Sequence, residues 1–448
     1  MSTQFSHDLL VIGAGSGGVR AARVAAGHGA RVAIVEEHRI GGTCVVRGCV
    51  PKKLLVYGAH FAEDLEDAQR FGWQLSGAAF DWATLRDNVL EQVTRLSGLY
   101  QQTLENHKVE ILRGHAVVTG PNSARIEGRD ITAKIILIAT GARPQTLSVP
   151  GIEHAITSNE AFHLERLPAR IVIAGGGYIA NEFAGIFNEL GSRVTLVNRS
   201  DRILRSYDAQ IRDRLLQISM TKGIQFLFNA PLERIERRAD GVLVVHLGGD
   251  TTLECEVFMC ATGRIPNTDG LGLASAGVEL EATGAVRVDE YSRSTCPSIY
   301  AVGDVTNRVQ LTPVAIREAQ AFAETVFGNT PTKVDYGCIP SAVFSHPPLA
   351  GVGLTEAQAR MQLGSVKVYT SDFRTMKNVL ANRNERALFK LVVDDTDDRI
   401  VGAHMIGPDA PEMLQVLAVA VKARLRKSQL DECVAIHPTM AEELVLMK

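Results

Sequence analysis

Two stretches of the chain repeat the same order of apolar and polar positions: a short apolar strand, a glycine-rich turn, an amphipathic helix and a second apolar strand. The first stretch runs from Asp8 to Glu37, and the second runs from Ile171 to Ser200. Apolar strands that alternate with helices are typical of a parallel sheet covered by helices on both faces. The pattern therefore predicts an α/β fold with two Rossmann-like, three-layer domains.

The first glycine-rich turn has the spacing of a dinucleotide cradle. Gly13 permits a tight turn, Gly15 lets the backbone approach a diphosphate, and Gly18 lets helix and strand pack closely. Glu36 ends the second strand, where a carboxylate accepts hydrogen bonds from ribose hydroxyls. An incidental glycine-rich turn is the alternative, but the flanking strands and the terminal acid favour a nucleotide site.

The second turn, Gly175 to Ala180, predicts a second cradle with a different preference. Asn198 occupies the place that Glu36 holds in the first stretch, so the ribose-binding carboxylate is missing. Arg199 and Arg205 follow, and a pair of guanidinium groups can hold a 2′-phosphate. This predicts NADP rather than NAD, whereas the alternative is that the arginines form a solvated basic face.

Three more fragments fit a protein with two nucleotide sites. The segments IILIATGARP and VFMCATGRIPN each lead from a strand into a Gly-Arg turn, as if closing the two domains in turn. Asp304 follows the buried strand of YAVGD and offers a carboxylate to a sugar or ribityl hydroxyl.

Composition and charge exclude several classes of partner. The 448 residues carry a formal net charge of −3, 46% are hydrophobic and 22% are charged. The interspersed charges argue against nucleic acid or anionic lipid as a partner, and no apolar run reaches the ~20 residues of a membrane span. The N-terminal segment lacks the pattern of a signal peptide, so we expect a cytoplasmic protein.

Seven cysteines are scattered along the chain, and only Cys44 and Cys49 are closely spaced. No spacing typical of a zinc site is present, and no metal is predicted. If the segment GGTCVVRGCVPKK begins a helix, the two sulfurs lie about one turn apart and near disulfide reach. A redox-active pair is predicted; a structural disulfide or two unrelated buried thiols are the alternatives.

The segment GGTCVVRGCVPKK resembles the redox-active signature of the pyridine-nucleotide disulfide oxidoreductases, and among them that of the glutathione reductases. The similarity continues in order through TRLSGLYQQTL, GGGYIANEFAGI, YAVGDV, LTPVAI, VFSHPPLAGVGLTE and IHPTMAEELV, and covers essentially the whole chain. The dithiol and HPT segments are specific, whereas many flavoproteins share the glycine loops. The resemblance implies FAD and NADPH as cofactors, glutathione disulfide as the substrate and a homodimer with shared active sites.

The resemblance also implies a division into domains, including an α+β dimerisation domain at the C-terminus. The expected parts are residues 1–141 (FAD-binding, first part), 142–264 (NADPH-binding), 265–335 (FAD-binding or central, second part) and 336–448 (interface).

Catalytic roles follow from the same resemblance. Cys49 is expected to face the flavin, and Cys44 to attack the substrate disulfide. His437 is expected to act as the acid/base on the dithiol of the other subunit, oriented by Glu442, with a cis peptide between His437 and Pro438. Lys52 and Glu182 match an ion pair near the flavin, and Tyr178 matches a side chain that shields the flavin.

The remaining predicted contacts fall into three sets. The FAD set is Gly13, Gly15, Ser16, Gly17, Gly18, Glu36, Thr43, Cys44, Lys52, Ala116, Thr140, Gly141, Asp304 and Thr312. The NADPH set is Gly175, Gly177, Tyr178, Ile179, Glu182, Arg199, Arg205 and Gly263. The substrate set is Ser16, Arg23, Tyr100 and His437.

Two positions depart from the glutathione reductase pattern. Gln320 stands where many members have an arginine, and Leu446 where a threonine is frequent. Each change removes a polar contact to the tripeptide, and Arg317, one turn earlier on the same predicted helix, is the candidate to compensate. A different low-molecular-weight or mixed glutathione disulfide is therefore the alternative substrate. Trypanothione is disfavoured because Arg20 stands where trypanothione reductases have an acid.

Other classes fit the residues less well. Lys52-Lys53 argues against a dihydrolipoamide dehydrogenase, and the lack of a C-terminal cysteine pair beside Cys433 argues against mercuric and large thioredoxin reductases. A redox sensor with little turnover and a flavoprotein oxidase are the candidates from other classes, but an oxidase does not need the cysteine pair.

Overall fold

The computed structural model describes residues 5–448, and the chain divides into two compact units. Unit 1 contains Met1–Leu54, Thr84–Gln145 and Gly263–Val334; unit 2 contains Leu55–Ala83, Thr146–Thr262 and Asp335–Lys448. Two helices continue from one unit into the other, α3 (Cys49–Asp67) and α4 (Trp82–Asn106). Within residues 5–448, no helix combines the length and apolar character that a membrane span requires.

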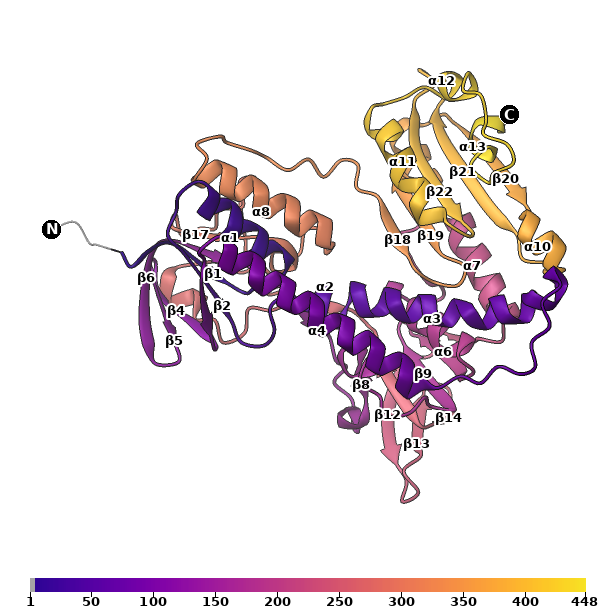
Figure 1. Cartoon of the computed structure of the whole chain (residues 1–448), viewed down its shortest axis with the longest axis horizontal. Helices are drawn as coiled ribbons and strands as arrows, with labels where there is room; N and C mark the ends of the chain where they lie inside the picture. The colour runs from indigo at the N-terminus through magenta and orange to yellow at the C-terminus, as the bar shows by residue number, and fades with distance from the viewer. Residues whose placement is uncertain (1–4) are drawn as a thin grey trace. The chain divides into compact units, whose positions relative to one another are not determined.

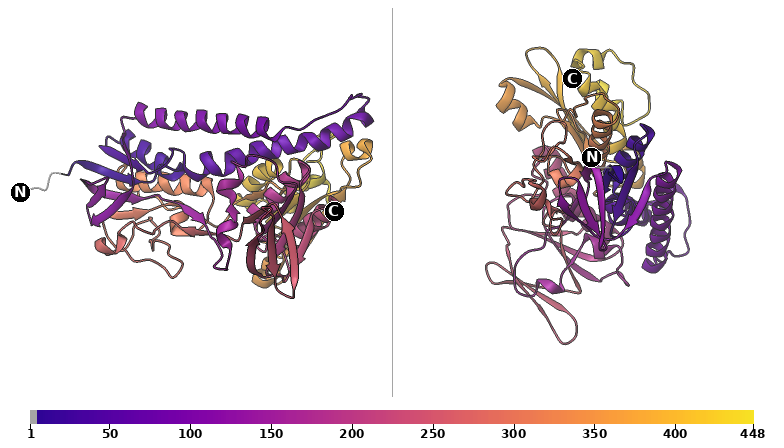
Figure 2. Two further views of the ribbon diagram at one scale, coloured as in Figure 1. Left: turned by 90° about the horizontal axis from the view of Figure 1, so that it is seen from below. Right: turned by 90° about the vertical axis from the view of Figure 1, so that its left-hand side faces the viewer.

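Unit 1 is built on the first predicted strand–turn–helix–strand repeat. Its parallel strands are β3 (Glu110–Arg113), β2 (Val32–Glu36), β1 (His7–Ile12), β6 (Arg129–Ile138) and β17 (Ile299–Ala301). The antiparallel strands β4 (Ala116–Gly120) and β5 (Ser123–Ile126) extend from β6. Helices α1 (Ser16–Gly27) and α8 (Thr312–Val326) lie side by side against this sheet (Figures 1 and 2).

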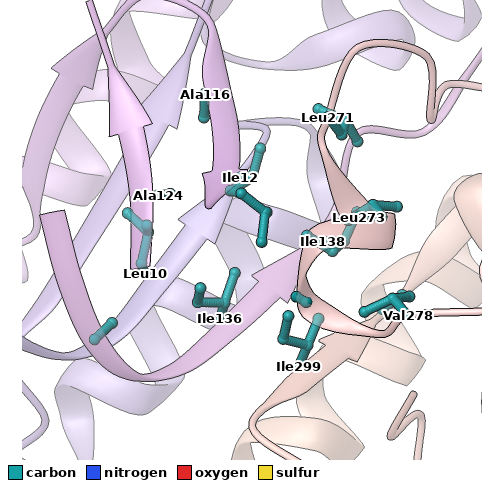
Figure 3. Packing of buried hydrophobic residues seen from close by; sticks show 14 of the residues in the cluster. Leu10, Ile12, Ala116, Ala124, Ile136, Ile138, Leu271, Leu273, Val278 and Ile299 are labelled. Carbon is teal, nitrogen blue, oxygen red and sulfur yellow. The ribbon is translucent and has the colours of Figure 1, made fainter. Parts of the chain in front are cut away.

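Both faces of the parallel sheet are buried, which explains why β1 is apolar at every position from Leu9 to Ile12. Successive side chains of a strand point to opposite faces. Leu9 and Val11 therefore join the core beneath α1 and α8. Leu10 and Ile12 join the core on the opposite face, together with Ile136 and other side chains shown in Figure 3.

Unit 2 contains the second repeat as a parallel sheet in the order β11-β10-β9-β15-β8. Its strands are β11 (Gln225–Phe228), β10 (Arg193–Asn198), β9 (Arg170–Ala174), β15 (Val257–Cys260) and β8 (Ile156–Thr157). Helix α6 (Tyr178–Glu189) connects β9 to β10, and α7 (Ala209–Thr221) connects β10 to β11. A separate three-stranded sheet is formed by β12 (Leu232–Arg237), β13 (Leu243–Leu247) and β14 (Thr251–Cys255).

The C-terminal part of unit 2 is an antiparallel sheet in the order β18-β19-β22-β21-β20, covered by helix α11 (Ala410–Lys422) (Figure 1). Its strands are β18 (Ser341–Val343), β19 (Leu349–Gly353), β22 (Ile400–Ile406), β21 (Ala387–Asp394) and β20 (Val366–Phe373). Helices α9 (Glu356–Leu363), α10 (Met376–Ala381), α12 (Lys427–Asp431) and α13 (Glu443–Leu446) complete it. The predicted fold class, two Rossmann-like domains and an α+β C-terminal part, is confirmed; the four domain boundaries stay a prediction.

Candidate active site

The first glycine turn has the geometry of a nucleotide cradle. Gly13 has a φ of +103°, and a Cβ there would lie 2.5 Å from the carbonyl oxygen of Ala139. A Cβ on Gly18 would lie 1.9 Å from the carbonyl oxygen of Gly13, so neither position accepts a side chain. At Gly15 the nearest atom to an added Cβ is 3.9 Å away, which leaves the backbone open to a ligand.

Two carboxylates flank this cradle. Glu36 accepts hydrogen bonds from the backbone amides of Ala14 (2.8 Å) and His38 (3.0 Å), so it stabilises the turn, and its predicted contact with a ribose stays a prediction. Burial raises the pKa of Asp304, and Arg264 opposes that shift. The Asp304 carboxylate accepts no hydrogen bond from any group that the structure describes in residues 5–448, so it is suited to a ligand hydroxyl.

Several other predicted FAD contacts also lie in unit 1. The Thr140 hydroxyl donates to the carbonyl of Asn267 (2.7 Å), and Gly141 has a φ of +68°. Ala116 is buried in the core of Figure 3, so only its backbone is able to face a ligand. The sequence pattern did not single out Glu318, which lies on α8 and is 1% exposed. Its carboxylate accepts a hydrogen bond from the amide of Gly303 at 2.6 Å and so fixes the turn before Asp304.

The dithiol segment packs directly on the cradle. The amide of Gly41 donates to the carbonyl of Ala14 (2.9 Å), and a Cβ on Gly42 would lie 2.6 Å from the Cα of Gly15. Cys44 lies in α2 (Gly42–Arg47), and Cys49 is the first residue of α3. The break between these helices at Gly48 was not predicted. It follows that the cysteines sit beside the turn that would hold the flavin nucleotide.

Cys44 and Cys49 are thiols and not a disulfide, and they are hydrogen-bonded to each other. This hydrogen bond, together with burial, raises the pKa of Cys44, whereas the hydroxyls of Thr312 and Ser16 lower it. The Cys49 sulfur lies 3.6 Å from the Thr312 hydroxyl oxygen. In this environment Cys44 is protonated near neutral pH, so a base has to remove its proton before it acts as a nucleophile.

Polar side chains of the predicted substrate set gather around Cys44. The Ser16 hydroxyl lies close enough to lower the pKa of both Cys44 and Tyr100. Burial and the neighbouring Cys44 raise the pKa of Tyr100, whereas Ser16 and the charges of Arg20 and Arg23 lower it. The structure therefore brings Ser16, Arg23 and Tyr100 together beside one thiol of the pair.

Gln320 stands where the resemblance predicts an arginine, and it forms hydrogen bonds with nearby side chains. Its side-chain amide donates to Glu324 (2.7 Å) and accepts from Arg20 at 3.5 Å. Burial and the charge of Arg23 lower the pKa of Arg20. Two guanidinium groups thus lie close to each other near Cys44, and Arg317 is exposed on α8.

The second glycine turn repeats the cradle geometry in unit 2. Gly175 has a φ of +136°, and a Cβ there would lie 2.3 Å from the carbonyl oxygen of Ala261, while Gly177 has open space. Tyr178 and Ile179 begin α6 directly after Gly177, and Tyr178 is 43% exposed. Asn198 is buried and donates from Nδ2 to the carbonyl of Arg202 (2.9 Å), so it shapes the loop instead of binding a ribose as an acid would.

The loop after Asn198 carries three arginines and one aspartate. Arg199 and Arg205 are exposed, and Arg205 lies 3.9 Å from Asp201. Arg202, which was not predicted, forms an ion pair with Asp201. The loop keeps an excess of positive charge, as a phosphate site requires.

Three predicted contacts divide between the units. Lys52 is buried in unit 1, whereas Glu182 is buried in unit 2, where it accepts from the amide of Phe344 at 2.9 Å. Gly263 belongs to unit 1, and its carbonyl accepts from the amide of Gln145 (2.9 Å). The Lys52–Glu182 ion pair and the NADPH contact of Gly263 stay predictions.

The predicted acid/base pair is formed within the C-terminal segment. His437 Nδ1 lies 2.9 Å from a Glu442 carboxylate oxygen, and the hydrogen bond from His437 lowers the pKa of Glu442. The peptide bond between His437 and Pro438 is cis, as predicted. The His437 side chain is 78% exposed, so its Nε2 side is open to a partner or a substrate.

Unit 2 also contains one group of side chains with possible metal ligands, which the sequence analysis did not single out. The potential ligand atoms of Glu63, Glu189 and His346 lie within 4.8 Å of one another. The ammonium group of Lys222 forms ion pairs with both carboxylates. A cationic side chain therefore already offsets part of their charge.

Taken together, the residues fit the two predicted cofactors. The first cradle, with Glu36 and the available Asp304 carboxylate, fits a dinucleotide that carries a polyhydroxyl chain, as FAD does. The second cradle, with Arg199 and Arg205, fits a dinucleotide that carries a 2′-phosphate, as NADPH does. A dithiol beside the first cradle is able to exchange with a disulfide.

Comparison with known proteins places these features in one family. A family model described as pyridine nucleotide-disulphide oxidoreductase matches residues 7–319, and the corresponding dimerisation-domain model matches residues 339–448. Glutathione reductase of Burkholderia cepacia is 50% identical over 445 residues, which are 99% of either chain. Glutathione reductase of Nostoc sp. is 45% identical over 457 residues, covering 99% of this chain and 100% of the relative.

A third relative is named for a different substrate. Trypanothione reductase of Trypanosoma congolense is 39% identical over 469 residues, covering 99% of this chain and 95% of the relative. All three matches extend along the whole chain, so they include both cradles, the dithiol and the His437 segment.

Proposed function

We propose that this chain, which belongs to the pyridine nucleotide-disulphide oxidoreductase family, uses NADPH to reduce glutathione disulfide to glutathione and so maintains the cellular thiol pool. The observation that carries the proposal is the hydrogen-bonded thiol pair of Cys44 and Cys49 beside the first cradle. The two glutathione reductases among the relatives, at 50% and 45% identity over nearly the whole chain, support this substrate over trypanothione.

The dithiol carries out the exchange with the substrate. The first cradle, with Gly13, Gly15 and Glu36, would hold FAD, which would supply the electron pair of NADPH to the Cys44–Cys49 disulfide. The Cys44 thiolate then attacks one sulfur of glutathione disulfide, which forms a mixed disulfide and releases one glutathione. Cys49 attacks the Cys44 sulfur, which releases the second glutathione and restores the Cys44–Cys49 disulfide. Two electrons and two protons thus pass to the substrate.

His437 supplies the proton transfers in this scheme. The pKa of Cys44 is raised by its hydrogen bond to Cys49 and by burial. A base is therefore needed to form the Cys44 thiolate. His437, oriented by Glu442, accepts the Cys44 proton and returns it to the departing glutathione thiolate. The roles near the flavin that the resemblance implies for Tyr178, Lys52 and Glu182 are part of this proposal.

The active site is proposed to be shared between two subunits of a homodimer. The segment that carries His437 also displays Val434, which is 95% exposed, and Ile436, which is 77% exposed. Exposed apolar side chains directly before a catalytic histidine suit a segment that becomes buried against a second copy. The match of residues 339–448 to a dimerisation domain supports a homodimer. We place the protein in the cytoplasm, where cysteines outside a redox-active pair stay reduced.

A turnover assay tests the substrate. The purified holoenzyme is assayed with NADPH against glutathione disulfide, lipoamide, trypanothione disulfide and mixed glutathione disulfides. The highest kcat/KM is expected for glutathione disulfide, because Arg20 and Arg23 near Cys44 favour an anionic substrate over the cationic trypanothione. A clearly higher kcat/KM for a mixed disulfide would favour the alternative substrate and would assign a role to Gln320 and Leu446.

The second cradle predicts a strong preference for NADPH over NADH. Replacement of Arg199 and Arg205 by glutamine is expected to raise KM for NADPH by ~10- to 100-fold, because two charge-assisted contacts to the 2′-phosphate are lost. KM for NADH, which lacks that phosphate, is expected to change little. Steady-state kinetics with both nucleotides measure the difference, and Arg95→Gln on the exposed face of α4 serves as the control. Equal kcat/KM values for NADPH and NADH in the native protein would contradict the prediction.

A further inference from the structure

The most deeply buried lysines include one that the proposed reaction does not use. Lys427, the first residue of α12, is 2% exposed. Its ammonium group donates to Asp431 and to the backbone carbonyl of Met447 (2.8 Å), and it lies 4.6 Å from the centre of the Tyr369 ring. A buried ammonium is costly unless it is paired, and here three partners from separate elements surround it.

These contacts attach the end of the chain to the body of unit 2. Met447 is 4% exposed and Leu444 is 8% exposed, and both join the apolar core of the antiparallel sheet. The Ser371 hydroxyl of β20 donates to Glu443, the first residue of α13. Lys427 thus links α12 to the residue that follows α13.

The segment between α12 and α13 carries the proposed acid/base. Residues 432–439 are exposed except for Ala435, so the body of unit 2 covers little of this segment. Inside it, Thr439 accepts from the amide of Glu442 (3.2 Å) and donates to the carbonyl of Ile436 (2.7 Å). These local bonds fix the shape of the segment, but its position on unit 2 depends on its two ends, α12 and α13.

We propose that Lys427 is a positioning residue for His437: its ammonium group joins the two ends of the 432–442 segment and thereby fixes where His437 and Glu442 stand. Lys427 touches neither the substrate nor a cofactor. The inference rests on the proposed function, in which His437 activates Cys44. It explains why a charged side chain is kept at a site where an apolar residue would be easier to bury.

Replacement of Lys427 by methionine tests the inference in the holoenzyme. Methionine keeps most of the side-chain volume and removes the ammonium group. We expect kcat for glutathione disulfide to fall by ~10- to 100-fold, because a displaced acid/base loses its alignment with the reacting sulfur. KM for glutathione disulfide and the rate of flavin reduction by NADPH are expected to stay unchanged. Lys427→Arg is expected to restore most of kcat, and Lys367→Met, at an exposed ion pair with Asp395, is the matched control.

A double-mutant cycle separates positioning from a general loss of structure. In a His437→Ala background, Lys427→Met is expected to lower kcat no further, because the group that it positions is absent. An additional loss of similar size in that background would overturn the inference, as would an unchanged kcat in the single variant. If Lys427→Met fails to fold, Asp431→Asn takes its place in the same cycle, with the same two outcomes. If His437→Ala itself keeps full turnover, the proposed role of His437 fails, and that result is distinct from a failure at Lys427.

Discussion

Replacement of Cys44 by serine is expected to abolish disulfide turnover while NADPH still reduces the flavin. Cys44 lies beside Ser16 and Tyr100, where the substrate is proposed to bind. A serine hydroxyl is a much weaker nucleophile than a thiolate and cannot form the mixed disulfide. We expect kcat for glutathione disulfide to fall by ~1,000-fold or more. Stopped-flow absorbance measures flavin reduction, and NADPH consumption in the steady state measures turnover.

Two other cysteine variants make this prediction specific. Cys433→Ser is the matched control, since Cys433 is exposed, and it is expected to keep full turnover. Cys49→Ser is expected to release one equivalent of glutathione per subunit and then stop, because Cys44 can form the mixed disulfide but nothing resolves it. Full turnover by Cys44→Ser, or repeated turnover by Cys49→Ser, would show that the roles of the two thiols have been assigned wrongly.

The glycine cradles could be predicted from the sequence because local backbone geometry alone demands their residue type. Gly13 and Gly175 have φ values of +103° and +136°, and a Cβ at either position would collide with a backbone carbonyl. Only glycine fits such a position, so its presence at the right spacing indicates the turn itself. The Cys44–Cys49 spacing is also informative because it is local: a short separation in sequence limits how far apart the two sulfurs lie.

The buried charges could not be predicted because tertiary packing decides them. Glu318 and Lys427 read as ordinary polar positions on short amphipathic segments, yet they are 1% and 2% exposed. Their partners include the amide of Gly303 and the carbonyl of Met447, which no local pattern connects to them. The role of the Asn198 amide is similar: the sequence shows a missing acid, but the fold shows the hydrogen bond from Asn198 that shapes the loop.

Contacts that cross the two units, or that require a second subunit, rest on the family resemblance. Lys52 and Glu182 are both buried, although each belongs to a different unit. His437 and Glu442 form their pair within one segment, and Cys44 lies in the other unit. Local sequence determines each half of such a predicted pair, and experiments on the dimer test whether the halves meet.

Replacement of His437 by alanine is expected to lower kcat for glutathione disulfide by ~100- to 10,000-fold, the range typical of a lost general acid/base. The pKa of Cys44 is raised by its hydrogen bond to Cys49 and by burial, so without His437 little of the Cys44 thiolate forms near neutral pH. Flavin reduction by NADPH is expected to keep its native rate, because that step does not require the Cys44 thiolate. His107→Ala, directly after the end of α4, is the control, since the His107 side chain is exposed and its ring nitrogen bonds to the carbonyl of Thr103.

Mixed dimers then determine which subunit supplies His437. A heterodimer of Cys44→Ser and His437→Ala subunits, purified through two different affinity tags, has one site with both replacements and one site with neither if His437 acts on the partner subunit. Such a dimer is expected to show about half of the native turnover, because the two sites of a symmetric dimer are equivalent. If His437 instead acts on Cys44 of its own subunit, each site carries one replacement and the heterodimer is inactive. Separately purified Cys44→Ser and His437→Ala homodimers are inactive under either arrangement, so activity that arises only on heterodimer formation identifies a site built from both chains.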